Sequence, residues 1–318
     1  MAFRVFTRVL SAATLFLILA GALVTSTGSG LSVPDWPTSY GYNMFTFPMH
    51  LMVAGILFEH GHRLVATTVG FLTIVLAVWL WWRDDRRWLR WFGVVALAVV
   101  ILQGVLGGLT VLMKLPAPIS IGHAGLAQIF FCMMVATAVF SSRGWLDGHG
   151  AVDDPALRRL SLWTVAVVYV QILLGATMRH THAGLAIPDF PLAFGRWLPP
   201  SWSAPVAIHF AHRVGAVVAT AMIVWLVVHV RTRHGANRWL ALPAAVLLLL
   251  VIAQFTLGAY VIWTARDMYV NSLHVMTGAL VLATSLTLSL RAHRSRFAGL
   301  PRRSPLEEPQ GGRRRVAA

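Results

Sequence analysis

The chain has 318 residues, of which 57% are hydrophobic and only 12% charged, against about 25% charged in soluble domains. Its net charge of +15 does not indicate a nucleic-acid partner, because the basic residues stand in short clusters between long apolar runs, as topology signals do in membrane proteins. The single cysteine, Cys132, excludes an intrachain disulfide and a metal site built on several cysteines.

Eight apolar runs are long enough, or nearly so, to cross a bilayer core, which takes about 20 residues of helix. In chain order they are 9–25, 62–82, 91–113, 119–142, 160–178, 209–230, 239–265 and 268–290. The first run follows Arg4 and Arg8 and resembles a signal peptide. Its match to the internal run 160–178 argues against cleavage.

Arginines mark alternate connections between these runs. They cluster at the N-terminus, in 83–90, 143–159 and 231–238, and after residue 291, whereas residues 26–61 contain no Lys or Arg. The positive-inside rule then places both termini in the cytoplasm. We expect a multi-pass protein of a bacterial inner membrane, with a basic cytoplasmic tail, 296–318, that is disordered.

One string of residues occurs twice. Residues 21–41 read GALVTSTGSGLSVPDWPTSYG and residues 175–195 read GATMRHTHAGLAIPDFPLAFG, which predicts two copies of one unit. Four helices per copy is an even number, so both copies have one orientation, related by an axis along the membrane normal. The predicted fold is therefore an all-α membrane protein of two pseudo-symmetric four-helix bundles, 1–145 and 155–295, joined by a polar linker. The long outer loops, 26–58 and 179–208, are expected to form ordered turns or short helices.

Four of the thirteen histidines recur at matching places in the two copies: His62 and His123, then His212 and His274. All four are expected near the outer ends of their helices. Two imidazoles on neighbouring helices can supply both axial ligands of a haem iron. The alternatives are structural hydrogen bonding between helices and a zinc or copper site, which lacks a third repeated ligand. Other histidines, such as His229 and His234, are expected at inner helix ends or in cytoplasmic loops.

Small and basic residues near these histidines agree with a porphyrin slot. Gly107 and Gly258 are in register, although glycine in membrane helices also serves close packing. Arg63 and Arg213 each follow a candidate ligand. They could pair with haem propionates or extend to the outer headgroups.

The two copies differ at one acidic position. Glu59 stands three residues before His62, on the same helix face, whereas the second copy has His209 at this position. A carboxyl group there would suit proton delivery or substrate positioning at an iron site. The alternative is an ion pair with Arg63 or a histidine. His60 is a rival ligand, but it points away from this face.

Taken together, several motifs of this chain resemble the haem A synthase family over about residues 5–295. The motifs are TGSGLSVPDWP, Glu59-His60-Gly61-His62-Arg63, Gly122-His123-Ala124, His212-Arg213 and Leu273-His274. The resemblance implies two pseudo-symmetric four-helix bundles and an enzyme that oxidises a ring methyl of haem O to a formyl group by successive hydroxylations. The upstream haem O synthase is the implied partner. The electron donor is not indicated.

The resemblance also implies roles for single residues. His62 and His123 would bind the substrate haem O, His212 and His274 would bind the cofactor haem b, and Glu59 matches the acid that the family requires. Some bacterial members carry a cysteine pair in the first outer loop, where this chain has Val33 and Ser39. A redox role for such a pair cannot apply here.

Two other functions fit parts of the pattern. A di-haem cytochrome b would need haems near both membrane faces, whereas all four histidines are expected near the outer one. A haem carrier would not need Glu59.

Overall fold

The computed structural model describes residues 1–297 of the chain. Its α-helices in that part are α1 Ala2–Ser26, α2 Ala54–Arg83, α3 Arg87–Leu112, α4 Ala117–Ser141, α5 Arg143–Leu146, α6 Pro155–His180, α7 Ala204–His234, α8 Arg238–Trp263 and α9 Met268–Ala292. All except α5 are long and apolar enough to cross a membrane, which confirms the eight predicted spans among the described residues. The predicted disordered tail lies outside them, apart from a short 3-10 helix, Arg294–Phe297.

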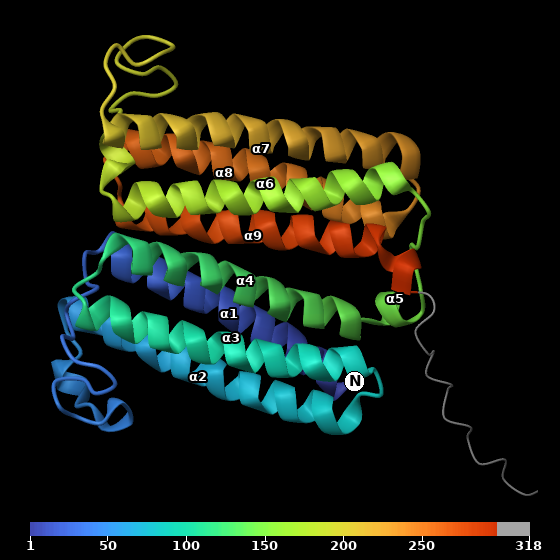
Figure 1. Cartoon of the computed structure of the whole chain (residues 1–318), viewed down its shortest axis with the longest axis horizontal. Helices are drawn as coiled ribbons and strands as arrows, with labels where there is room; N and C mark the ends of the chain where they lie inside the picture. Colours follow the sequence, from blue (N-terminus) through green and yellow to red (C-terminus); the bar gives the residue numbers. More distant parts are fainter. Residues whose placement is uncertain (298–318) are drawn as a thin grey trace, which may run out of the picture.

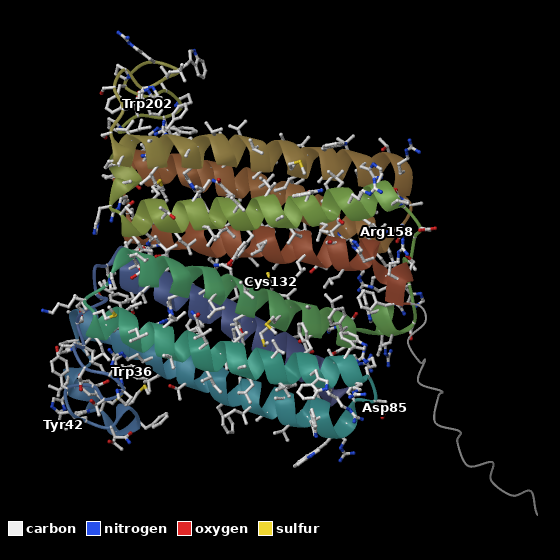
Figure 2. All side chains as sticks on the ribbon, in the orientation of Figure 1. Trp36, Tyr42, Asp85, Cys132, Arg158 and Trp202 are labelled. Carbon is white, nitrogen blue, oxygen red and sulfur yellow. The ribbon has the colours of Figure 1, made fainter. Side chains whose placement is uncertain are left out.

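The long helices form two groups, α1–α4 and α6–α9 (Figure 1). In the first group α2 and α4 each pack on α1 and α3, so they occupy opposite corners, and α7 and α9 do the same on α6 and α8. The groups meet through α1, α4, α6 and α9. The most apolar windows of α4 and α9 are 61% and 50% buried, against 22–28% in the other six spans, so these two helices are the most enclosed. Cys132, on α4, lies between the groups in Figure 2 and packs against the core of α6–α9.

Capping residues set where two of these helices begin. Pro155 opens α6, where its missing amide hydrogen is no loss, and the Asp154 carboxylate accepts the Leu157 amide at 2.9 Å. Asp267 caps α9 by accepting the amides of Tyr269 and Val270, each at 3.0 Å. These caps determine how far along each helix the following side chains lie.

Seven of the eight long helices begin before their apolar runs, and two of these early starts, in α2 and α7, bear on candidate site residues. α2 begins at Ala54 instead of residue 62, and α7 at Ala204 instead of 209. The first turns of α2 carry Glu59 and His60, which lower the hydropathy but have partners in the outer loop. His62 therefore lies in the third turn of α2 and does not open the helix. The linker between the copies also contains the short helix α5.

The two long loops lie at the same end of the molecule (Figure 1). The first contains the 3-10 helices Met44–Thr46 and Met49–Leu51, and the second contains Ala183–Leu185. This confirms the prediction of turns and short helices. Figure 2 places Trp36 and Tyr42 in the first loop and Trp202 in the second, whereas Asp85 and Arg158 lie at the opposite end.

Candidate haem-binding sites

The four predicted histidine ligands share one packing arrangement, in which each imidazole lies against a glycine of a neighbouring helix. The pairs are His62–Gly21, His123–Gly107, His212–Gly175 and His274–Gly258. A Cβ atom added to these glycines would lie 2.9, 3.1, 3.0 and 3.2 Å from the Cε1 atom of the paired ring. Carbon atoms pack best at about 3.5–4.0 Å, so glycine leaves the room that each ring needs. Gly21 and Gly175 are themselves the first matched residues of the repeated string.

The histidines also occupy equivalent positions along their helices. His62 and His212 are each the ninth residue of their helix, counted from Ala54 and Ala204, and His123 and His274 are each the seventh, counted from Ala117 and Met268. His123 is close enough to His62 to act on it electrostatically, and His274 stands in the same relation to His212. Each half thus directs two imidazoles into its bundle from opposite corners.

Glutamine amides hold three of the four histidines. The pairs are Gln103–His123, Gln171–His212 and Gln254–His274, with amide nitrogen to ring nitrogen distances of 3.4, 3.1 and 3.3 Å. Gln171 also donates to the backbone carbonyl of His212 at 2.8 Å. The first copy has Leu17 in the place of Gln171. The sequence analysis missed Gln171, although one amide in an apolar run was a signal for it.

The residues fit a haem group at each pair of histidines. The Nδ1 atoms of His62, His123 and His274 are buried and have no hydrogen-bond partner among the described residues, and leaving such an atom unpaired costs about 1–3 kcal/mol. Two neutral imidazole nitrogens per site are ligands that a haem iron takes, and the glycines give the imidazole rings room between the helices. A zinc site needs more ligands, and within residues 1–297 the one cluster of three His, Cys, Asp or Glu ligands lies elsewhere.

Glu59 and Arg63 form a buried ion pair that fastens the first outer loop to α2. The Glu59 Oε1 atom lies 2.6 Å from Arg63 Nη2, with the two side chains 4% and 10% exposed. Glu59 Oε2 accepts the Val33 amide at 2.8 Å. Arg63 also donates to the carbonyls of Val33, Asp35 and Thr38 at 2.9, 2.7 and 3.0 Å. The structure thus has the ion pair that was the alternative reading of Glu59, and Arg63 directs both Nη atoms at protein groups.

The second half fastens its loop in the same way, without an acid. Nδ1 of His209 accepts the Ile187 amide at 3.2 Å. Arg213 donates to the carbonyls of Ile187, Asp189 and Leu192 at 3.3, 2.6 and 2.8 Å. His209 therefore performs the loop contact of Glu59, and the carboxylate is not required for that contact.

The aspartates of the repeated string also hold the loops. Asp35 accepts the amides of Tyr40 and Gly41 at 2.7 and 2.9 Å, and Asp189 accepts two equivalent amides, both at 2.7 Å. Partial burial acts to raise the pKa of Asp35, but the hydrogen bonds from Gly41, Thr38 and Tyr40 outweigh it and lower the pKa to about 2. The Gly195 amide is the largest cause of the lowered pKa of Asp189. The strings thus recur because they fold the same loop twice.

His60 has a loop partner and is separate from the ligand set. Its Nδ1 lies 2.9 Å from the Ser39 hydroxyl, and its ring centroid lies 4.6 Å from that of Phe47. Ser39 and Val33, the two positions where some family members have cysteines, are both 0% exposed. In this chain these positions serve the contacts of His60 and Glu59 with the loop.

Arg179, near the end of α6, is a candidate to which the sequence analysis gave no role at the sites. Its Nη2 atom donates to the Ala22 carbonyl and the Ser26 hydroxyl of α1, both at 2.8 Å, and no acidic side chain in residues 1–297 forms a salt bridge with it. The Arg179 guanidinium is close enough to His274 to act on that imidazole electrostatically. The next residue, His180, is close enough to His123 for the two imidazoles to interact electrostatically. A half-buried cation between the two sites without an acid partner favours an anionic ligand.

Comparison with known proteins agrees with this geometry. The COX15-CtaA family, described as cytochrome oxidase assembly proteins, matches residues 41–286. A protein of Halalkalibacterium halodurans named Heme A synthase is 27% identical over 88% of this chain and 94% of its own length. Proteins of the same name from Shouchella clausii and Symbiobacterium thermophilum are 30% and 31% identical, over 80% and 78% of this chain and 84% and 82% of their own lengths. The chain belongs to the COX15-CtaA family.

Proposed function

We propose that this chain is a haem A synthase, an oxidoreductase that oxidises a ring methyl group of haem O to a formyl group by successive hydroxylations. The proposal is supported by the family, by relatives named Heme A synthase over most of the chain, and by the four histidine–glycine contacts at one end of the bundles. These contacts are the observation that carries the proposal, because they supply two imidazoles to each of two sites.

The two sites are assigned different porphyrins. Haem O, the substrate, binds between His62 and His123, and haem b, the cofactor, binds between His212 and His274. The assignment rests on Glu59, which occurs in the first half only. Haem b supplies one-electron transfer when bound.

Glu59 is assigned the acid–base role in the reaction. It stands three residues before His62 on α2 and is held by Arg63 and the Val33 amide, so its carboxylate has a defined position in the half that carries the proposed substrate ligands. The same contacts fasten the first outer loop to this end of α2.

Arg179 is assigned to a porphyrin propionate. The sequence analysis gave this role to Arg63 and Arg213 as one of two alternatives, and they take it only if their guanidinium groups exchange loop carbonyls for a carboxylate. Arg179 has less competition, because its hydrogen bonds to described residues use the Nη2 atom only.

The setting follows from the substrate and the topology. We infer a bacterial inner membrane with both termini in the cytoplasm, haem O synthase as the partner that delivers the substrate, and an electron donor of unassigned class. A di-haem cytochrome b and a haem carrier are less well supported. A di-haem cytochrome b needs haems near both membrane faces, whereas the four histidines lie at one end of the bundles. A haem carrier does not need the Glu59 carboxylate.

The test is mass analysis of the porphyrins extracted from protein produced together with haem O synthase. We expect haem b plus haem A or a hydroxylated intermediate. In His62→Leu protein the farnesylated porphyrins should be lost and haem b kept, whereas His212→Leu should lose haem b. Protein that holds haem O and haem b and never an oxidised product would point to a carrier and contradict the proposal.

A further inference from the structure

A second group of ligand-type side chains lies at the opposite end of α6–α9 from the four histidines. Asp154 precedes α6, and His229 and His234 lie at the end of α7. The Asp154 Oδ2 atom is 2.8 Å from Nε2 of His229 and 2.8 Å from Nε2 of His234. The three ligand atoms all lie within 4.8 Å of one another. The sequence did not indicate that these three residues lie close together in space.

The carboxylate is held in place by the helix it caps. Its second oxygen, Oδ1, accepts the Leu157 amide at 2.9 Å, so Oδ2 stays directed at the two imidazoles. The side chains of Asp154, His229 and His234 are 16%, 18% and 16% exposed. The group is therefore ordered by its surroundings and still open to an ion and to water.

We propose that Asp154, His229 and His234 form a binding site for a divalent first-row transition-metal ion of the Zn²⁺ type. Imidazole and carboxylate ligands together suit such ions, whereas Mg²⁺ and Ca²⁺ prefer oxygen ligands alone. In a tetrahedral site, metal–ligand bonds of about 2.0–2.2 Å place neighbouring ligand atoms about 3.3–3.6 Å apart. The two nitrogen–oxygen pairs at 2.8 Å need to open by about 0.5–0.8 Å to admit the ion.

Nearby charges leave the site accessible to a cation. Arg158 is engaged with Asp153, at 2.7 Å, and Arg231 and Arg233 are exposed, where solvent and salt screen them. A bound ion would join the start of α6 to the end of α7. The site is separate from both haem sites, so the inference does not depend on the proposed function.

The experiment uses the full-length, haem-loaded protein in detergent, with any purification tag removed and loosely held metals stripped by a chelator. Equilibrium dialysis against Zn²⁺ should load one ion per chain, and a hundredfold excess of Mg²⁺ should not displace it. Zinc-edge X-ray absorption should report two imidazole ligands. Haem loading keeps the four haem-site histidines from taking up zinc.

Three variants test the ligand set. His229→Gln and His234→Gln should each weaken Zn²⁺ binding at least tenfold. Asp154→Asn should do the same, and because asparagine caps a helix as well as aspartate does, its haem content should be unchanged. His149→Gln is the matched control, since this exposed histidine also lies near a carboxylate, Asp147, at 3.7 Å. Absence of stoichiometric zinc in the unaltered protein, or equal weakening by His149→Gln, would overturn the inference.

Discussion

Replacing Glu59 by histidine separates the two tasks that this carboxylate can have. His209 accepts a loop amide at the equivalent place in the second half. Glu59→His therefore keeps an acceptor for the Val33 amide while it removes the negative charge. Glu59→Ala removes both.

The contacts give the size of the effect on stability. Glu59→Ala leaves a buried amide without an acceptor, which costs about 1–3 kcal/mol. It also breaks a buried ion pair, for which costs of about 3–5 kcal/mol are known. Arg63 keeps three loop carbonyls, as Arg213 does without an acid, so we expect the lower end of that range. Glu59→His regains the amide contact and should be about 1–3 kcal/mol more stable than Glu59→Ala.

The assay measures haem b content, thermal unfolding and the mass of the extracted porphyrins. Glu59→His should keep haem b and lose conversion of haem O by at least about a hundredfold, because general acid–base groups contribute about 10²–10⁴ to rates. His209→Glu in the other half is the control and should still convert haem O. Conversion by Glu59→His at the unaltered rate would mean that the carboxylate only fastens the loop, and the reasoning would be refuted.

Three further predictions concern the ligand cradle, the cation between the sites and the loop. Gly175→Ala places a Cβ atom 3.0 Å from the ring of its paired histidine. It should weaken haem b binding about tenfold or more, since overpacking costs about 1–3 kcal/mol. In the control, Gly104→Ala, the added Cβ atom enters open space, and haem b content should be unchanged. Arg179→Gln should lower a haem reduction potential in a redox titration, because a nearby cation favours the reduced iron, while Arg196→Gln in the exposed loop should not. The pKa of Asp35 is lowered to about 2 from 3.8, so its stabilisation of the loop is complete above about pH 4 and is lost as the pH falls through 2. Limited proteolysis should detect the loop becoming less ordered at low pH. In Asp35→Asn protein the loop should be less ordered already at neutral pH.

Much of the fold and of the grouping of candidate ligands could be predicted because their signals are local or repeated. Eight apolar runs needed only length and composition. The four histidines were identified because polar side chains are rare in such runs and these four recur at fixed spacing. Gly107 and Gly258 were found in the same way, although their contact with the histidine rings became visible only in the structure.

Other features depend on contacts that no local pattern records. The early start of α2 depends on partners for Glu59 and His60 in a loop more than twenty residues away. Hydropathy therefore placed the helix start too late. The contact of Arg179 with Ala22 and Ser26 depends on how the two groups of helices meet, because the side chain at the end of α6 reaches across to the end of α1. Asp154 and His234 are 80 residues apart and meet only because α6 and α7 are neighbours.

The distribution of differences between the two copies is itself an argument about function. Where the copies agree, as at Asp35 and Asp189, the shared residues fold the outer loops. Two of the many positions at which they differ bear on the histidine sites. The first copy has Leu17 in the place of the glutamine that holds His212, and the second has His209 in the place of Glu59. Because an imidazole or a carboxylate can fasten the loop equally, folding does not explain why one copy has the acid. A histidine without a glutamine partner, in the half that carries the carboxylate, suits a site whose porphyrin is exchanged and altered, and a histidine held by an amide suits a porphyrin that stays.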